Sequence, residues 1–231
     1  MFDFLVTADG GLTTAGYTAS IVAVLVLVVL IAALLQKKTS TLKFTTQQLV
    51  TCAAALALAY VTSYIKLFKL PFGGSVTLFS MLFIVLIGYW YGVEVGILTG
   101  LVYGIFQFLQ EPYVLSFFQV CCDYIFAFGA MGLSGLFTKS KKYGLLKAYI
   151  TAILARGAFH ALGGYLYWMD YMPDNFPKSL TALYPIIYNY SYILLEGILT
   201  IVVISVPAVS SALGRMRAMA TGGNRQPAAQ K

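Results

Sequence analysis

Charged side chains are scarce in this sequence of 231 residues. Asp, Glu, Lys and Arg make up 10% of the chain, whereas soluble domains carry roughly 25%. Hydrophobic residues make up 60%, which excludes an ordinary soluble domain and indicates an integral membrane protein. The formal net charge is +7, but the basic residues lie in short clusters between apolar runs. That placement is typical of membrane topology signals, so we expect a lipid bilayer and no nucleic acid as surroundings.

Residues and motifs that carry reaction chemistry are also few. The cysteines Cys52, Cys121 and Cys122 lie inside apolar runs without the spacing of metal ligands. We therefore expect packing residues rather than a disulfide framework or a metal site. The sequence has a single histidine and neither a Gly-rich phosphate loop nor a nucleophile elbow. These absences predict a protein with no catalysis, no cofactor and no ATPase of its own.

Apolar stretches of suitable length predict seven membrane-spanning helices in an all-α protein. The first lacks the basic start and cleavage site of a signal peptide, so we expect a retained helix. This pattern predicts an N-terminal extra transmembrane helix with a cytoplasmic linker (1–44), a membrane core (45–213) and a disordered basic tail (214–231). The predicted spans are 18–35, 48–68, 76–91, 93–109, 116–138, 146–168 and 184–213.

Basic residues gather in alternate loops between the predicted spans. The positive-inside rule makes the richer side cytoplasmic, with the N-terminus outside and the C-terminus inside. The opposite side receives only Lys66, Lys69 and Lys178. The richer side carries Lys37, Lys38, Lys43, Lys139, Lys141, Lys142, Lys147, Arg215, Arg217, Arg225 and Lys231.

Asp123 lies in the middle of the fifth predicted span, where a carboxylate is costly unless it faces protein or water. At a rise of ~1.5 Å per residue, Asp123, His160 and Asn189 all lie roughly 8–12 Å below the outer ends of their helices. This shared depth predicts a pocket that opens to the outside, and a buried carboxylate capped by a hydroxyl is the alternative. Aromatic residues available around the pocket are Tyr124, Trp168, Tyr184 and Tyr188.

An acidic group beside aromatic faces and a histidine suits a cationic, planar, heteroaromatic ligand. A proton relay through Asp123 and His160 is a second possibility. Arg156 and Glu196 lie deeper, roughly 18 Å from the outer ends. Since each alone would be costly in the membrane, we expect them to pair or to share a polar network with a structural role.

Small residues recur four positions apart on two predicted helices. Ala53 and Ala57 form one such face, and Gly96, Gly100 and Gly104 form another. Small residues at this spacing let a second helix approach closely. The alanine face fits either docking of a partner protein or packing within the bundle, and the sequence alone favours packing.

Several longer segments carry a family resemblance. Residues 45–213 resemble the thiamine-specific membrane substrate-binding subunit (S component) of energy-coupling factor (ECF) transporters. The resemblance lies in the order and spacing of these segments together with the Ala-rich helix before them. The segments are PFGGSVTLFSM (71–81), QVCCDYIFAFGAMGLSGLF (119–137), RGAFHALGGYLYW (156–168) and YPIIYNYSYILLEG (184–197).

The resemblance implies a six-helix core that captures thiamine from outside the bacterial cell membrane. It also implies docking on a transmembrane scaffold subunit that two cytoplasmic ATPase subunits drive. The family's docking face corresponds to Ala53 and Ala57. Its ligand-binding positions correspond to Tyr113, Asp123, Tyr124, His160, Trp168, Tyr184 and Asn189.

The sequence also differs from this family at several positions. The stretch 18–35 lies outside the six-helix core, Asp123 stands where some relatives have Glu, and the loop after the first core helix has Phe68 and Phe72 but no Trp. A thiamine precursor or analogue therefore remains an alternative ligand. A proton-coupled secondary transporter is the competing function, although no convincing inverted repeat is visible. A membrane enzyme is the least favoured, because metal ligands and a clustered nucleophile are missing.

Overall fold

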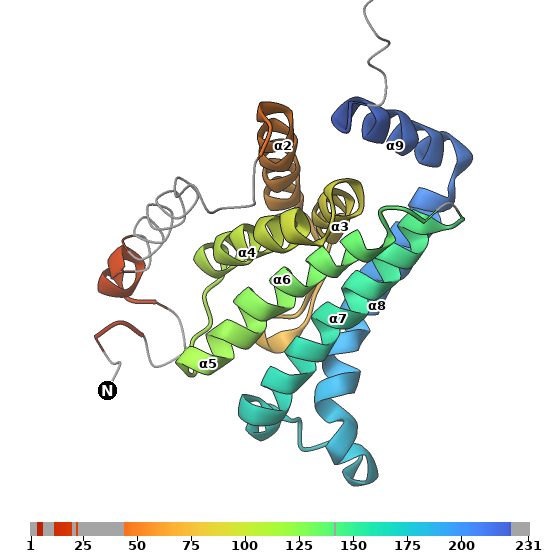
Figure 1. Ribbon diagram of the computed structural model, residues 1–231. Coiled ribbons are helices and arrows are strands. Elements are labelled where there is room, and N and C mark those ends of the chain that lie inside the picture. Colours follow the sequence, from red (N-terminus) through yellow and green to blue (C-terminus); the bar gives the residue numbers. More distant parts are fainter. Residues whose placement is uncertain (1–3, 7–11, 20–21, 23–43, 141, 223–231) are drawn as a thin grey trace, which may run out of the picture.

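The computed structural model describes residues 4–6, 12–19, 22, 44–140 and 142–222, and most of them belong to a helical bundle (Figure 1). Four of its helical segments are long and apolar enough to cross a membrane: Val93–Gln110, Phe117–Phe137, Gly144–Tyr167 and Lys178–Ser205. A shorter apolar helix, α3, covers Ser80–Tyr91. The predicted all-α membrane class is thus confirmed. Most of the predicted span 18–35 lies outside the described residues.

Close packing of α4 (Val93–Gln110) fixes the position of the segment Phe117–Phe137. A Cβ atom on Gly100 would lie 2.2 Å from the carbonyl oxygen of Phe128, and one on Gly104 would lie 1.9 Å from that of Tyr124. Only glycine permits so close an approach of two backbones. The predicted glycine face is therefore a packing surface inside the bundle.

The segment Phe117–Phe137 is helical throughout, but its winding changes along the chain. Ser116 caps the N-terminus of helix α5 (Phe117–Val120), and its hydroxyl accepts a hydrogen bond from the Gln119 backbone N–H at 3.1 Å. A π-helical turn, Cys121–Phe126, follows and contains Asp123. Helix α6 (Ala127–Ala130) and a 3₁₀ segment, Met131–Phe137, complete it. The π-helical turn widens the helix at Asp123, and such turns are frequent at functional sites.

Two predicted spans begin or end in a β-hairpin, so their boundaries were wrong. Helix α2 (Thr46–Ser63) ends before strand β1 (Lys66–Lys69), which pairs antiparallel with β2 (Ser75–Thr77). A 3₁₀ turn, Pro71–Gly73, joins the strands. The apolar residues Leu67 and Phe68 lengthened the predicted span beyond the end of α2. In the structure they belong to β1, and their side chains are exposed. Hydropathy alone does not separate a helix end from a short strand.

The last predicted span also ended too late. Helix α8 (Tyr184–Ser205) stops at an extended Val206, and Pro207 opens α9 (Pro207–Ala220). Proline lacks the N–H that would continue the α8 hydrogen-bond ladder. The sequence predicted a disordered tail over residues 214–231, but residues 214–220 are helical. Residues 223–231 lie outside the described part.

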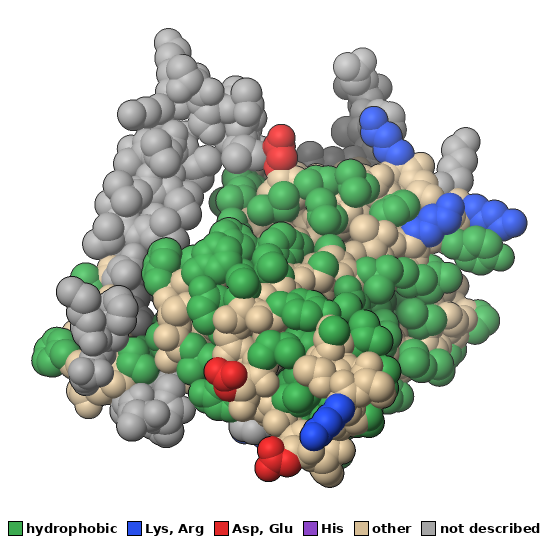
Figure 2. Space-filling model, turned by 90° about the horizontal axis from the view of Figure 1, so that it is seen from below, with side chains coloured by type: hydrophobic (Ala, Val, Ile, Leu, Met, Phe, Trp, Pro, Cys, Tyr) green, Lys and Arg blue, Asp and Glu red, His purple; other side chains and the backbone are tan. Residues whose placement is uncertain are grey.

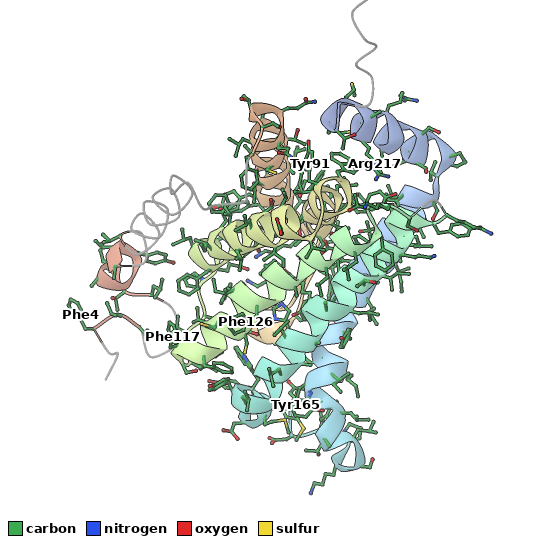
Figure 3. The ribbon with its side chains drawn as sticks, in the orientation of Figure 1. Phe4, Tyr91, Phe117, Phe126, Tyr165 and Arg217 are labelled. Carbon is green, nitrogen blue, oxygen red and sulfur yellow. The ribbon has the colours of Figure 1, made fainter. Side chains whose placement is uncertain are left out.

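Helix α9 packs across one end of the bundle, beside α3 (Figure 3). The Arg217 guanidinium lies 4.5 Å from the ring centroid of Tyr89 and donates a hydrogen bond to its hydroxyl at 3.1 Å. The Tyr91 hydroxyl donates to the carbonyl oxygen of Ala220 at 2.9 Å. These contacts hold the basic C-terminal helix at the end of the bundle opposite the β-hairpin.

The outer surfaces of the helices are apolar, as expected for lipid contact. Seen from below, hydrophobic side chains cover most of the molecule and charged ones lie in isolated places (Figure 2). On α8, Ile198 and Val202 are about 60% exposed (59% and 61%). On α2, Ala53 and Ala57 are exposed, whereas Ala55 and Ala59 face the bundle. The predicted alanine face therefore lies on the outside of the described bundle.

Candidate functional site

A cavity of about 790 Å³ lies where the C-terminal ends of α4 and α7, the N-terminal end of α8, the segment Phe117–Phe137 and the β-hairpin meet. Helix α7 covers Gly144–Tyr167. The structure brings together in this cavity every ligand-binding position that the sequence predicted: Tyr113, Asp123, Tyr124, His160, Trp168, Tyr184 and Asn189. These residues come from separate helices and loops, so the tertiary fold creates the cavity.

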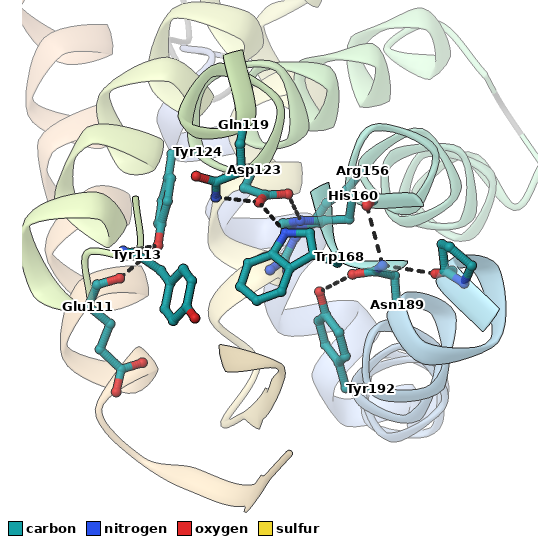
Figure 4. A network of polar contacts seen from close by, with 11 residues as sticks. Glu111, Tyr113, Gln119, Asp123, Tyr124, Arg156, His160, Trp168, Asn189 and Tyr192 are labelled. Carbon is teal, nitrogen blue, oxygen red and sulfur yellow. Dashed lines mark hydrogen bonds and ion pairs between the residues drawn. The ribbon is translucent and has the colours of Figure 1, made fainter. Parts of the chain in front are cut away.

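The Asp123 carboxylate lies at the centre of a polar network in this cavity (Figure 4). The Gln119 side-chain amide donates to Oδ2 at 2.7 Å, and the Trp168 indole N–H donates to the same oxygen at 3.4 Å. Nδ1 of His160 lies 3.2 Å from Oδ1. The Asp123 side chain is 14% exposed, so it is held in place and still reachable from the cavity. An oriented carboxylate of this kind can bind a cationic group.

The contact with Arg156 indicates which ring nitrogen of His160 carries the proton. Its Nε donates to Nε2 of the imidazole at 3.3 Å, and a guanidinium can only donate. Nε2 therefore accepts, and Nδ1 carries the proton that is donated to Asp123. This arrangement describes a neutral imidazole between an arginine and an aspartate. The Arg156 guanidinium also lies 4.6 Å from the Phe128 ring centroid.

The predicted pair of Arg156 and Glu196 is not observed as a direct contact. The structure gives no hydrogen bond or ion pair between these two described side chains. Glu196 is instead surrounded by donors at the junction of β2 and α3, including the Thr77 backbone N–H at 2.8 Å. Arg156 lies one turn before His160 on α7 and joins the cavity network instead. Arg156 and Glu196 thus have separate polar partners, His160 for the arginine and the β2–α3 junction for the glutamate.

Several aromatic rings line the cavity together with Asp123. The rings of Tyr113 and Trp168 lie 4.7 Å apart at 39°, and Trp168 also contacts Tyr171 at 5.1 Å. On α8, Tyr184 and Tyr188 lie 5.9 Å apart. Aromatic faces attract cations and stack on planar rings. The wall can therefore hold a flat, positively charged ligand.

Tyr124 and Asn189 line the cavity but also hold its walls together. The Tyr124 hydroxyl donates to the Glu111 carbonyl at 2.7 Å and accepts from the Tyr113 N–H at 3.1 Å. The Asn189 amide donates to the carbonyl oxygens of Pro185 and His160 at 2.8 and 3.3 Å. These bonds orient both side chains before any ligand arrives.

Several cavity residues were missed by sequence reasoning. Gln119 is fully buried and lies one helical turn before Asp123, a spacing that could have identified it. Tyr192 donates to Oδ1 of Asn189 at 3.0 Å and lies three positions after it. The hairpin wall had no helical spacing to reveal it, and its cavity-lining residues are Lys69, Leu70, Pro71, Gly73, Gly74 and Ser75.

Glu111 fastens the hairpin to the end of α4. Its carboxylate forms ion pairs with Lys66 and, at 3.2 Å, with Lys69. Partial burial is the largest single influence and raises the pKa of Glu111, but hydrogen bonds and attraction from the two lysines together outweigh it. The pKa of Glu111 therefore lies below its ordinary value, and the carboxylate stays charged at neutral pH.

The described residues include no cluster of three or more His, Cys, Asp or Glu that could hold a metal ion. The cavity lining provides the carboxylates of Asp123 and Glu111, the side-chain amides of Gln119 and Asn189, and several aromatic rings. Such a site suits reversible binding of a small cation.

Comparison with known proteins identifies the family. The profile described as "Thiamine transporter protein (Thia_YuaJ)" matches residues 49–213. The thiamine transporter ThiT of Bacillus subtilis (strain 168) is 31% identical over 170 residues, which is 66% of this chain and 83% of that protein. A solved structure of ThiT from Listeria monocytogenes superposes with a TM-score of 0.59 at 24% identity, covering 72% of this chain and 96% of that one, and shows the shared fold. The matched residues make up well over half of this multi-pass membrane chain, which therefore belongs to the thiamine transporter family.

Proposed function

We propose that this chain is the thiamine-capturing S component of an ECF-type vitamin importer. The observation that carries the proposal is the Asp123 carboxylate, held by Gln119, His160 and Trp168 inside an aromatic cavity. Thiamine has a positively charged thiazolium ring and a planar aminopyrimidine ring. Asp123 would face the positive ring, and Tyr113 and Trp168 would stack on a planar ring. Rigid, preorganised walls favour high affinity, because little ordering accompanies binding.

We further propose that the cavity opens to the outside of the cell. The described basic residues near the α9 end include Lys139, Lys142 and Arg217, and the cavity lies at the other end of the bundle. The positive-inside rule supports a cytoplasmic α9 and C-terminus. The same rule places the N-terminus outside, since an odd number of predicted spans precedes the C-terminus.

The energy for uptake would come from separate subunits, namely a transmembrane scaffold and two cytoplasmic ATPases. The sequence has no phosphate-binding loop of its own. The exposed positions of Ala53 and Ala57 on α2 support a docking face for the scaffold. Small residues there would let a partner helix approach closely.

Intrinsic fluorescence of the purified protein tests the proposed ligand directly. Trp168 lines the cavity, whereas Trp90 is buried in α3 away from it. Thiamine should quench the emission saturably at submicromolar concentration, and Trp168→Phe should remove the response. Trp90→Phe is the matched control and should keep it. A response only to the isolated pyrimidine or thiazole half would replace thiamine by a precursor, and no response to any of them would contradict the proposal.

A proton-coupled secondary transporter is the second candidate, because Nδ1 of His160 lies 3.2 Å from the Asp123 carboxylate. The two functions differ in sealed vesicles that contain this chain alone. A capture subunit should bind thiamine without accumulating it, even with an imposed pH gradient. Accumulation driven by that gradient would favour proton coupling and would contradict the need for an energising module.

A further inference from the structure

Glu196 is a buried carboxylate that does not line the cavity. Its side chain is on α8, and the residue is 2% exposed. Thr77 donates to Oε2 from both its backbone N–H and its hydroxyl at 2.8 Å. The Met81 backbone N–H and the Ser80 hydroxyl lie 3.3 and 3.5 Å from Oε1. The donors lie more than 110 residues before Glu196 in the chain, so the carboxylate joins two distant parts of the fold.

The groups that Glu196 holds form the junction between β2 and α3. Phe79, between them, has φ 61°, a left-handed conformation that is unfavourable for a side chain of this size. Phe79 occupies the N-cap position of α3 and provides no side-chain capping bond. Glu196 replaces that missing cap from α8 and satisfies the Met81 N–H. Its hydrogen bonds thereby connect α8 to the residues on both sides of this left-handed turn.

The orientation of the hairpin depends on that junction, because β2 leads directly from the cavity wall to Thr77. The hairpin residues 69–71 and 73–75 line the cavity. Two further contacts fix the hairpin against α8. The Tyr188 hydroxyl donates to the Pro71 carbonyl, and a Cβ on Gly74 would meet the Tyr192 ring at 2.7 Å. Helix α8 thus supports the hairpin at its tip, its middle and its base.

We propose that Glu196 is a positioning residue for ligand binding: by fixing the β2–α3 junction, it holds the hairpin wall of the cavity against a bound ligand. This inference deepens the proposed function and rests on it, since the ligand in the test is thiamine. Glu196 touches no ligand itself. Because the hairpin is a wall of the cavity, we expect loss of Glu196 to act mainly on the rate constant of ligand dissociation.

Glu196→Gln tests this role because it keeps the shape and replaces one acceptor oxygen by a donor that would face other donors. We expect the thiamine dissociation rate constant to rise by about tenfold, with faster amide hydrogen exchange over residues 70–81. Both are measured on the full chain in detergent, by stopped-flow fluorescence and by exchange mass spectrometry. Glu94→Gln, at an exposed position of α4, is the matched control and should change neither quantity.

A dissociation rate within about twofold of wild type for Glu196→Gln would overturn the positioning role, whatever happens to thermal stability. If Glu196→Gln does not fold, Thr77→Val decides, because it removes only one hydroxyl donor. A rise of a few fold is then expected, and an unchanged rate overturns the inference. Failure of wild type to bind thiamine would instead count against the proposed function. Exchange over residues 70–81 in the ligand-free protein would still decide whether Glu196 holds the hairpin.

Discussion

Asp123 is the residue on which we expect ligand binding to depend most. Gln119, His160 and Trp168 orient its carboxylate, and Arg156 donates its hydrogen bond to His160 rather than to Asp123. The negative charge of Asp123 is thus oriented without being paired directly with a cation. A cationic ligand would provide the missing countercharge.

Replacing Asp123 by Asn should therefore weaken binding without unfolding the protein. The charge is lost, and the new NH₂ group would face either the donors of Gln119 and Trp168 or the Nδ1–H of His160. We expect thiamine affinity to fall by about 10- to 100-fold, measured by fluorescence titration. Asp170→Asn, at an exposed position after α7, is the matched control and should bind normally. Equal affinities of the two variants would contradict the role of Asp123.

The lowered pKa of Glu111 predicts that the stability of the folded protein depends on pH. Its folded pKa is below the unfolded value of about 4.3, so its contribution is complete above that pH and is lost as pH falls through the folded pKa. The side chain is 44% exposed, so solvent limits the contribution to less than about 1 kcal/mol.

Glu111→Gln should accordingly lower the melting temperature slightly at pH 7, and the difference from wild type should vanish towards pH 3. Thermal unfolding of both proteins across this range measures the effect. Asp174→Asn, at an exposed loop position, serves as the control for loss of a surface carboxylate. A difference that persists unchanged at pH 3 would show that the lysine pairs are not its cause.

At the scale of elements, the contact between α4 and the segment Phe117–Phe137 sets the position of Asp123. Gly100 allows this contact because a Cβ there would lie 2.2 Å from the Phe128 carbonyl oxygen. A Cβ on Gly129 would meet only the flexible end of Leu101, at 3.0 Å. The two glycines face the same interface with very different room around them.

Gly100→Ala should therefore separate the two segments, whereas Gly129→Ala should be tolerated. We expect Gly100→Ala to destabilise the protein by about 1–3 kcal/mol and to weaken thiamine binding by displacing Asp123. Gly129→Ala should change stability by less than about 1 kcal/mol, because leucine can move. Thermal unfolding and titration of both variants test this, and similar losses in both would contradict the packing argument.

At the scale of the whole molecule, binding and uptake should be separable. Ala57 is exposed on α2, away from the cavity lining, so Ala57→Trp should leave thiamine binding unchanged. If α2 docks on a scaffold, the bulky side chain should abolish uptake in cells. Val202→Trp, on an exposed part of α8, is the matched control and should permit uptake. Loss of binding in Ala57→Trp would mean that this face supports the bundle, and normal uptake would exclude it as the docking face.

Some features of this protein follow from the sequence alone. The scarcity of charge and the long apolar stretches predicted a helical membrane protein, because lipid offers no partners for exposed polar backbone. Asp123, His160 and Asn189 could be predicted to meet, since helical rise gives the depth of each residue. Glycines four apart on α4 indicated close packing for the same geometric reason.

Other features depend on contacts between residues far apart in the chain. The hairpin after α2, the end of α8 at Pro207 and the π-helical turn at Asp123 did not follow from hydropathy, which averages over local detail. Glu196 was expected to pair with Arg156 or to share a polar network with it, but its carboxylate accepts hydrogen bonds from Thr77 and Met81. Helical spacing gives the depth of a side chain, but only the assembled bundle decides which of several donors at that depth it reaches.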